Sequence, residues 1–543
     1  MRAIDLYSGV GGWGLGLRLA GVNVVSSYEI SEAAVETQAV NLGHRPEKVD
    51  IRSLDFESLP KDIDVVVGSP PCTQFSFSNR GGSGDLLDGL KDVRKFLEVV
   101  EFLKPRYWVM ENVPRLSGIL SEQVFGRRGR LKQFSHLFEN GKADIRIVDM
   151  SAYGLPQRRI RCIVGSIPFD LLESYRDVVP PLVMDDVIRG LYSRTPRDEL
   201  YGVQLSRRDL SDAEIEEPLS EEELRMNRDS KQNHPIYNSM SFPDSLLLPS
   251  RTIAATCTRV SRESIVIYDK YFSKSIRRLS LREKALMQGF PIHFQFLGRS
   301  LGEKSRLVGN ALPPPFAYLV GCSLKKIKPE ALVSIKDRSK ALELPSACAL
   351  RTRTDRSGSS YNVARRFRAT IPNLRFKSGV RFELGNNFDG ASVCWTIRFF
   401  FGSSKMIHEV EVDGSLKQRI GRFKLGRLLT MAIERKWAAF ERVHAGLSSA
   451  DLQAVWCRRS EGPSPYLIVD TLGDLVGELI DEFQPDYVDE ARKIVGRLLE
   501  GDALTAGLAK VQRNALAVLV GLLVACKFNL WLTDFELRLD EAA

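Results

Sequence analysis

Short apolar runs alternate with amphipathic helical segments along the first 169 residues of the chain. The runs are AIDLYS, VNVVSSYE, DIDVVVGS, RYWVMENV and RIRCIVGS, and each ends at a polar or glycine-rich turn. Runs of this length between helical patterns predict the strands of a parallel α/β sheet. Because ligands bind outside the carboxyl ends of strands in such sheets, functional residues are expected in the turns that follow these runs.

The alternation stops after residue 169 and returns only in part. Residues 170–276 contain an acidic stretch, DLSDAEIEEPLSEEEL, and no strong periodicity follows it. Regular patterns resume in RRLSLREKALMQGFP and GNALPPPFAYLVGC, and a final region mixes strand-like runs such as ASVCWTIRFFF with long helical patterns. We therefore expect a first α/β part (1–169), an inserted region (170–276), the completion of the α/β part (277–327), a linker (328–355) and a separate α+β region (356–543).

Composition narrows the class of protein and of partner. The chain has 543 residues, too many for one ordinary domain, and its net charge of +9 fits a polyanionic partner such as nucleic acid. Its eight cysteines are scattered with no C-x-x-C pair, which argues against a disulfide framework and a zinc site. We therefore expect a reducing compartment and no metal.

Two segments bear on whether the chain meets a membrane. The first residues, MRAIDLYSG, show no secretory leader. The apolar segment ALAVLVGLLVAC is 12 residues long, whereas a membrane span needs roughly 20. We expect a buried helix here, no membrane contact and a cytoplasmic protein.

The first predicted strand leads into a glycine-rich loop, DLYSGVGGWGLGL. Its glycines allow a sharp turn and close approach to a ligand, and a helix N-terminus favours negative charge. The second strand ends at Glu29, where an acid accepts hydrogen bonds from ribose hydroxyls, although a surface acid would have the same position. Asp50, after a third short run, is suited to accept from an adenine amino group. No lysine and serine or threonine clamp for phosphates is present, so the pattern favours an adenosine cofactor without polyphosphate.

A thiol, an acid and two arginines follow or begin the other predicted strands. Cys72 comes directly after two prolines, whose fixed φ angles stiffen the turn, and Glu111 ends the strand RYWVMENV. Arg159 and Arg161 alternate with apolar residues and so share one face of a strand. Singly, each has a structural explanation, such as an inert buried thiol or a surface ion pair. Together, beside an adenosine pocket, they predict a reactive site with Cys72 as its nucleophile.

With these motifs the chain resembles the cytosine-C5 DNA methyltransferase family. The family's motifs occur in order between residue 4 and about residue 320, as DLYSGVGGWGLG, GSPPCTQFS, ENVP, QRRIRCIVG, RRLSLREKALMQGFP and GNALPPPF. The resemblance implies a Rossmann-like catalytic domain that uses S-adenosylmethionine. It also implies that residues 170–276 form an inserted target-recognition domain, and it leaves residues 356–543 as an accessory α+β domain of unknown role.

The resemblance assigns roles around the cofactor. Tyr7 would stack near the adenine, Glu29 would hold the ribose, Asp50 would accept from the adenine amino group, and Asn310 and Ala311 would close the methionine end. The residues expected around the cofactor are Asp5, Tyr7, Gly9, Gly11, Gly12, Glu29, Ile30, Asp50, Ile51, Pro70, Asn310 and Ala311.

The resemblance also assigns the chemistry. Cys72 would attack C6 of cytosine, Glu111 would protonate or hydrogen-bond N3, and Arg161 would hold O2 with support from Arg159. The target base must be flipped out of the duplex to be reached. The segment SFSNRGGSGDLLDG is expected to close over the DNA with Arg80 near a phosphate, a plain loop being the alternative. Arg251 and Arg259 are expected to contact guanine in the major groove.

The leading hypothesis is an enzyme that methylates cytosine in double-stranded DNA, in restriction-modification or phage defence, near the nucleoid of a bacterium or archaeon. The alternatives are methylation of tRNA and a catalytically silent DNA-binding protein.

Nine lysines and arginines between residues 351 and 381 indicate either phosphate contacts or a solvated linker. The C-terminal region is expected to bind DNA or a protein partner, and no feature specifies the target sequence or the oligomeric state.

Overall fold

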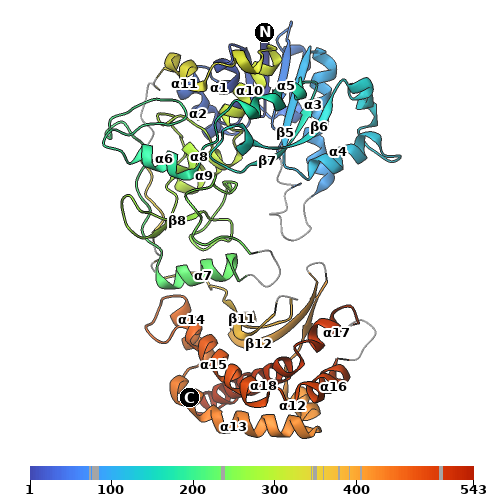
Figure 1. The fold of residues 1–543 in the computed structure, drawn as a ribbon, viewed down its shortest axis with the longest axis vertical. Helices are drawn as coiled ribbons and strands as arrows, with labels where there is room; N and C mark the ends of the chain where they lie inside the picture. Colours follow the sequence, from blue (N-terminus) through green and yellow to red (C-terminus); the bar gives the residue numbers. More distant parts are fainter. Residues whose placement is uncertain are drawn as a thin grey trace. The chain divides into compact units, whose positions relative to one another are not determined.

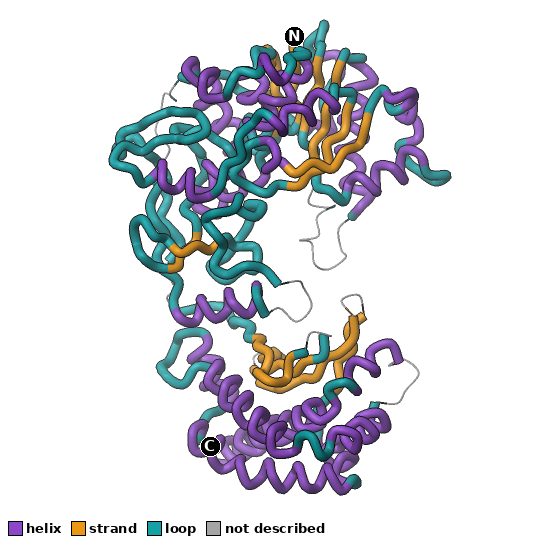
Figure 2. Tube along the Cα trace, in the orientation of Figure 1, coloured by secondary structure: helices purple, strands orange, loops and turns teal. Residues whose placement is uncertain are grey.

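The computed structural model describes most of the chain, and within that part it forms two compact units. The described residues are 1–71, 75, 85–233, 239–343, 345, 351–356, 358, 360–376, 379–389, 392–403, 406–499 and 505–542. The first unit comprises residues 1–227 and 241–357, and the second comprises residues 228–240 and 358–543. Each unit contains one larger sheet, shown in orange in Figure 2.

A seven-stranded sheet in the order β3-β2-β1-β4-β5-β7-β6 organises the first unit. Its strands are β1 Arg2–Leu6, β2 Asn23–Glu29, β3 Glu47–Lys48, β4 Val65–Gly68, β5 Tyr107–Asn112, β6 Asp144–Asp149 and β7 Ile160–Gly165. The first five strands in the sheet order pair in parallel, but β7 runs antiparallel to both β5 and β6. The expectation of a parallel sheet is therefore wrong at this edge. Because β7 is reversed, its first residues meet the last residues of β5 at one end of the sheet.

Helices bury both faces of this sheet. Along β4, Val65 and Val67 belong to the apolar cluster that includes α1, whereas Val66 belongs to the cluster that includes α3. A strand buried on both faces is apolar throughout, which explains the run of three valines. The helices of the first unit are α1 Gly12–Leu19, α2 Glu32–Leu42, α3 Leu86–Leu103, α4 Leu116–Phe125, α5 Phe169–Ser174, α6 Met184–Leu191, α7 Glu221–Lys231, α8 Leu281–Met287, α9 Leu301–Asn310, α10 Pro314–Leu324 and α11 Ile335–Arg338, of which α7 extends into the second unit.

The inserted region, residues 170–276, has little regular structure. Strand β8, Val266–Tyr268, lies within it and pairs antiparallel with β9, Ile276–Arg278, which begins at the last residue of the region. A buried ion pair within this part joins Arg259 to Glu223 at 2.6 Å. A second buried group ties it to the segment that follows, because Arg277 contacts Asp269 and Glu283 at 2.8 Å and all three side chains are fully buried. Where charged side chains rather than apolar ones fill the buried positions, the sequence shows no regular spacing of apolar residues. The hydrophobic pattern of this region is weak for that reason.

A buried histidine next to the inserted region makes stability depend on pH. His293 is buried, and burial together with the nearby Arg282 charge lowers its pKa to about 4. Between pH 6.5 and pH 4 the unfolded chain binds a proton at His293 that the folded chain excludes. His293 by itself therefore contributes a fall of about 1–3 kcal/mol in the free energy of unfolding across this window as pH drops. Urea denaturation of wild type and of His293→Gln at pH 7 and pH 4.5 measures this contribution as the difference between the two proteins.

A comparison between variants isolates the contribution of His293 to the pH dependence of stability. Burial raises the pKa of the neighbouring Asp198 to about 6, which acts in the opposite direction but equally in every variant. Between pH 7 and pH 4.5, His293→Gln should therefore lose about 1–3 kcal/mol less stability than wild type, whereas His136→Gln should behave as wild type because His136 is exposed. An identical pH dependence in all three proteins would contradict the assignment.

The second unit combines an antiparallel sheet with a group of helices. The strands, in the order β10-β11-β12-β13, are β10 Arg368–Arg375, β11 Arg381–Asp389, β12 Ser392–Ser403 and β13 Met406–Val410. The helices are α12 Gly414–Gly421, α13 Lys424–His444, α14 Ser449–Trp456, α15 Pro465–Phe483, α16 Val488–Leu498, α17 Thr505–Gln512 and α18 Ala515–Ala542. Figure 1 shows α12, α13, α15 and α18 gathered on one face of this sheet.

Several residues of the basic run between 351 and 381 are engaged within their own unit. Arg365 stacks on Trp456 with 3.7 Å from its guanidinium carbon to the ring centroid. Arg368 and Arg381 both pair with Glu383. These three arginines stabilise the second unit, so the run is not simply a solvated linker.

One helix of the second unit is long and apolar enough to cross a membrane. This apolar segment is residues 515–534 of α18, and 78% of its most apolar stretch is buried inside the protein. Such burial is typical of the core helix of a globular unit and favours the expected buried helix.

Candidate active site

The glycine-rich loop after β1 turns tightly and packs closely on its surroundings. Gly9 and Gly11 have φ angles of 55° and 89°, in the left-handed region that glycine adopts without strain. A Cβ atom added to Gly12 would lie 2.0 Å from the carbonyl oxygen of Leu312, so only glycine allows the start of α1 to approach this turn. The loop thus brings the N-terminal motif against the segment that follows α9.

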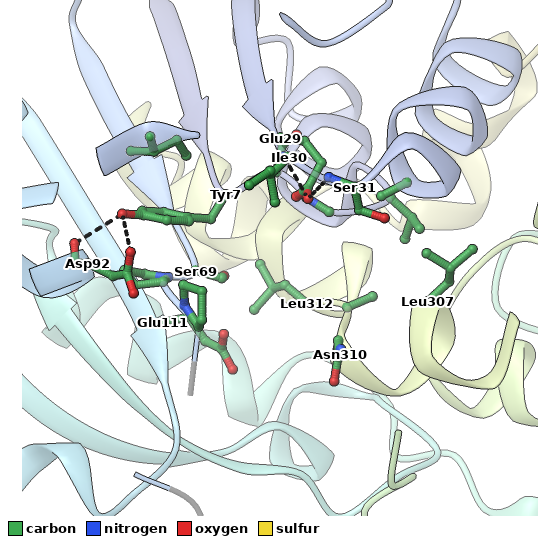
Figure 3. A pocket seen from close by; sticks show the side chains of 18 of the residues that line it. Tyr7, Glu29, Ile30, Ser31, Ser69, Asp92, Glu111, Leu307, Asn310 and Leu312 are labelled. Carbon is green, nitrogen blue, oxygen red and sulfur yellow. Dashed lines mark hydrogen bonds between the residues drawn. The ribbon is translucent and has the colours of Figure 1, made fainter. Parts of the chain in front are cut away.

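Glu29, the last residue of β2, is fixed by three backbone N–H groups. Its Oε2 accepts from Gly9 N at 2.8 Å, and its Oε1 accepts from Ile30 N at 3.0 Å and Ser31 N at 2.8 Å. Figure 3 shows this carboxylate with Ile30 and Ser31 beside it. Each carboxylate oxygen has two lone pairs, so Oε2 retains capacity to accept from a ligand hydroxyl.

Asp50 and Ile51 form the next part of the same wall. The Oδ1 atom of Asp50 accepts from Arg52 N at 3.0 Å and so caps the 3-10 turn η1, Ile51–Ser53. Ile51 is buried, whereas Ile30 is 61% exposed, and both side chains line the same cavity. An acceptor between two apolar side chains suits a planar base with an amino group.

These residues surround a cavity of about 740 Å³, which we call the central cavity. Its lining includes nine of the residues expected around a cofactor: Tyr7, Gly9, Glu29, Ile30, Asp50, Ile51, Pro70, Asn310 and Ala311. Gly11 and Gly12 are not among the lining residues and shape the loop behind it. Asp5 is also absent from the lining; it is fully buried, and burial together with the charge of Glu29 raises its pKa well above the usual range.

The acid and one arginine of the predicted reactive set lie together at the edge of the central cavity. Nε of Arg161 lies 2.9 Å from Oε1 of Glu111, and the side chains are 13% and 6% exposed. The contact follows from the reversal of β7, since Glu111 is near the end of β5 and Arg161 is near the start of β7. Cys162 points to the opposite face, and burial and the charge of Glu111 raise its pKa to about 12, which excludes it as a nucleophile at neutral pH.

Arg159 contacts different partners from Arg161. Its Nη2 donates to the carbonyl oxygen of Ala311 at 3.0 Å, and both terminal nitrogens donate to that of Gly309 at 3.3 Å. These carbonyls belong to the end of α9, where a cation is favoured by the helix dipole. Arg159 therefore positions the segment carrying Asn310, a role that the shared face with Arg161 did not reveal.

The turn that precedes the predicted nucleophile is held by the neighbouring strand. Asn112 Nδ2 donates to the carbonyl oxygen of Pro70 at 3.0 Å, and both Pro70 and Pro71 line the central cavity. Cys72 and Arg80 lie outside the described residues. The described chain reaches the cavity edge at Pro71, immediately before Cys72 in the sequence.

The two arginines expected to contact bases are bound within the protein. Arg251 forms a bidentate pair with Asp244 at 2.7 and 3.0 Å. Arg259 pairs with Glu223 at 2.6 and 2.9 Å, and its side chain is 6% exposed. These positions stabilise the inserted region and lend no support to base contacts by either residue.

The sequence patterns did not identify several of the residues that line the central cavity. Ser69, Asp88, Asp92, Arg306 and Leu307 also line the central cavity. Asp88 and Asp92 are four residues apart and therefore lie on one face of a helix, so their spacing could have identified them as a pair. Among the described residues no group of three or more His, Cys, Asp or Glu is arranged to hold a metal ion.

Comparison with known proteins gives a consistent set of relatives. The family model described as C-5 cytosine-specific DNA methylase matches residues 1–326. The type II methyltransferase M.FnuDI of Fusobacterium nucleatum is 26% identical over 60% of this chain and 94% of its own length, and M.NgoPII of Neisseria gonorrhoeae is 26% identical over 60% and 96%. The chain is also similar to a crystal structure of a DNA modification methyltransferase encoded within an E. coli prophage, with 23% identity and a TM-score of 0.45 over 60% of this chain and 99% of that one.

Proposed function

The chain belongs to the C-5 cytosine-specific DNA methylase family, and from that premise we propose which of its residues carry the reaction. It is a DNA cytosine-5 methyltransferase that uses S-adenosylmethionine. The observation that carries the proposal is the Glu111–Arg161 pair at 2.9 Å on the edge of the cavity that Glu29 and Asp50 also line. The DNA methylase match makes tRNA a weaker candidate substrate, and the buried acid–arginine pair disfavours a catalytically silent protein.

The central cavity fits S-adenosylmethionine in size and in donor set. Its volume of about 740 Å³ is within the range of small-molecule sites. We assign the ribose hydroxyls to Glu29, the adenine amino group to Asp50, and the two faces of the adenine to Ile30 and Ile51. Asn310 and Ala311 line the same cavity and are assigned to the methionine end. When bound, this cofactor supplies an electrophilic methyl group.

The remaining residues act on the base. C5 of cytosine is a poor nucleophile until a thiolate adds to C6, and we assign that attack to Cys72 on the motif GSPPC. The pyrimidine gains electron density as the C6–S bond forms, and a proton donated or shared by Glu111 at N3 stabilises it. Arg161 holds O2 of the base while its Nε keeps Glu111 in place. The carbon C5, made nucleophilic by the addition at C6, would then take the methyl group, with S-adenosylhomocysteine as the leaving group. Loss of the C5 proton to water, return of the C6–S electron pair to the Cys72 thiolate and return of the N3 proton to Glu111 restore the aromatic ring.

The DNA must present the cytosine outside the helix, because neither C5 nor C6 can be attacked within the stack. We propose that residues 170–276 form the target-recognition domain, whose buried ion pairs hold an irregular segment in one conformation. Arg80 remains our proposal for a phosphate contact. Base contacts are assigned to the exposed side chains of this domain rather than to Arg251 and Arg259, whose donors are engaged within the protein.

We propose that the enzyme serves a restriction-modification or phage-defence system in the cytoplasm of a bacterium or archaeon, near the nucleoid. The named type II methyltransferases among its relatives support this setting. Residues 356–543 lie beyond the matched region and form most of the second unit. We propose that they bind DNA or a protein partner.

Bisulfite sequencing of DNA from cells that express the protein tests activity and target together. Protected cytosines in one recurrent sequence context would support the proposal. In parallel, purified protein is incubated with tritiated S-adenosylmethionine and either duplex DNA or tRNA. Label in tRNA alone, with no protected cytosine in DNA, would overturn the substrate.

The assignment of Glu29 predicts a cofactor-specific defect. Glu29→Gln replaces one accepting oxygen with an NH2 group that cannot accept from the backbone N–H groups around it. We expect the KM for S-adenosylmethionine to rise more than about tenfold, corresponding to ~1.4 kcal/mol, with little change in the KM for DNA. Titration calorimetry with S-adenosylhomocysteine checks this result. Glu32→Gln, an exposed carboxyl on α2, is the matched control, and equal affinities in the two variants would contradict the assignment.

A further inference from the structure

Tyr7 is held in an uncommon conformation at the end of β1. Its φ angle is 55°, in the left-handed region that side chains other than glycine rarely adopt. Its hydroxyl group donates to the backbone oxygen of Asp92 at 3.2 Å and to Oδ1 of the same residue at 3.3 Å, as Figure 3 shows. The aromatic ring therefore has a fixed orientation in the wall of the central cavity.

Asp92 in turn belongs to a charged pair of carboxylates on α3. Arg52 Nε donates to Asp92 Oδ1 at 2.9 Å and Nη2 donates to Oδ2 at 2.7 Å, a bidentate arrangement. The same guanidinium donates to Asp88 Oδ1 at 2.9 Å and to the Asp88 backbone oxygen at 3.1 Å. The Asp92 side chain is only 8% exposed, so it depends on Arg52 as its counter-charge.

Arg52 also connects this pair to the proposed adenine acceptor. It follows Ile51 in η1, and its backbone N–H donates to Oδ1 of Asp50 at 3.0 Å. Within the described residues Oδ2 of Asp50 has no hydrogen-bond partner. One residue thus joins η1, α3 and, through Asp92, the end of β1, and all of these contribute to the lining of the central cavity.

We propose that Arg52 and Asp92 are positioning residues that hold the adenosine end of the cofactor site in its binding conformation. Their contacts keep the Tyr7 ring, the Asp50 carboxyl and Ile51 at fixed mutual positions before the ligand arrives. A site that is ordered in advance loses less conformational entropy on binding, so the network strengthens binding without touching the reacting atoms. This inference rests on the cofactor site proposed above.

The test separates cofactor binding from chemistry. Arg52→Gln should raise the KM for S-adenosylmethionine about tenfold, with kcat and the KM for DNA within about twofold of wild type. It should weaken S-adenosylhomocysteine and 5′-methylthioadenosine by the same factor, because the two ligands share only the adenosine end with its sulfur. Arg52→Lys should recover part of the loss. Arg45→Gln is the matched control, since Arg45 also contacts two carboxylates but does not line the cavity.

A second variant keeps the test valid if Arg52→Gln fails to fold. Tyr7→Phe removes only a hydroxyl group and should weaken both ligands about threefold, with no further loss when combined with Arg52→Gln, because both changes disable one network. Wild-type affinity in Arg52→Gln, alongside the expected defect in Glu29→Gln, would overturn this inference alone. Wild-type affinity in both would overturn the cofactor site itself. An equal fall in kcat and in thermal stability for Arg52→Gln and Tyr7→Phe, with unchanged ligand affinity, would show a structural role and also overturn the inference.

Discussion

Replacing Cys72 with alanine is expected to abolish methyl transfer to DNA. Without the thiolate no bond forms at C6, and C5 of an intact cytosine ring is too poor a nucleophile to take the methyl group. We expect kcat to fall at least about a thousandfold, a loss of ~4 kcal/mol in transition-state stabilisation. Incorporation of tritium from labelled S-adenosylmethionine into duplex DNA measures this change.

Binding and covalent trapping complete the test of Cys72. Affinity for S-adenosylhomocysteine should stay within about twofold of wild type, because the thiol is assigned to the base rather than to the cofactor. DNA containing 5-fluorocytosine cannot lose a proton from C5, so wild type should form an adduct that survives denaturation and Cys72→Ala should not. Cys394→Ala, at an exposed cysteine of β12, is the control. Undiminished label in DNA with Cys72→Ala would eliminate the covalent mechanism.

Replacing Glu111 with glutamine is expected to have the next largest effect. Glutamine preserves the size of the side chain and one acceptor for Arg161 but cannot supply an acidic proton at N3. General acid catalysis contributes about 100- to 10,000-fold, so kcat should fall within that range. The KM for S-adenosylmethionine should change little. Single-turnover assays with saturating cofactor and DNA measure the chemical step directly.

The control for Glu111 is a carboxyl of the same type away from the cavity. Glu101→Gln, at an exposed position on α3, should leave kcat unchanged. A rise in the KM for S-adenosylmethionine without a fall in kcat would place Glu111 in the cofactor site instead of at the base. Loss of activity in both variants to the same extent would indicate a general effect of removing charge.

The local features of the catalytic part were predictable because they depend on near neighbours in the chain. The three valines before Gly68, the glycine turn at Gly9 and the acid that ends β2 each follow from strand burial or backbone freedom. Strand β6 was missed for a local reason too: it lies at the sheet edge, and Ile147 is 51% exposed, so its pattern lacks a continuous apolar run.

The partners of the charged groups could not be predicted in the same way. Arg251 and Arg259 are of the residue type that contacts guanine, yet their guanidinium groups are paired with Asp244 and Glu223. Arg159 shares a strand face with Arg161 but contacts carbonyl groups about 150 residues later in the chain. A charged side chain pairs with whatever the fold brings within a few ångströms, and that depends on contacts between distant segments.

The sequence by itself determined the order of the family's motifs and the strands that carry them, and it predicted the residues that act on cytosine. Only the tertiary structure decided that β7 is reversed, which brings Arg161 to Glu111, and that Arg52 joins η1 to α3 at the wall of the central cavity. The physical reason is the range of the interactions. Burial and backbone geometry act along a few residues, whereas ion pairs and strand direction are settled by segments that meet only when the chain is folded.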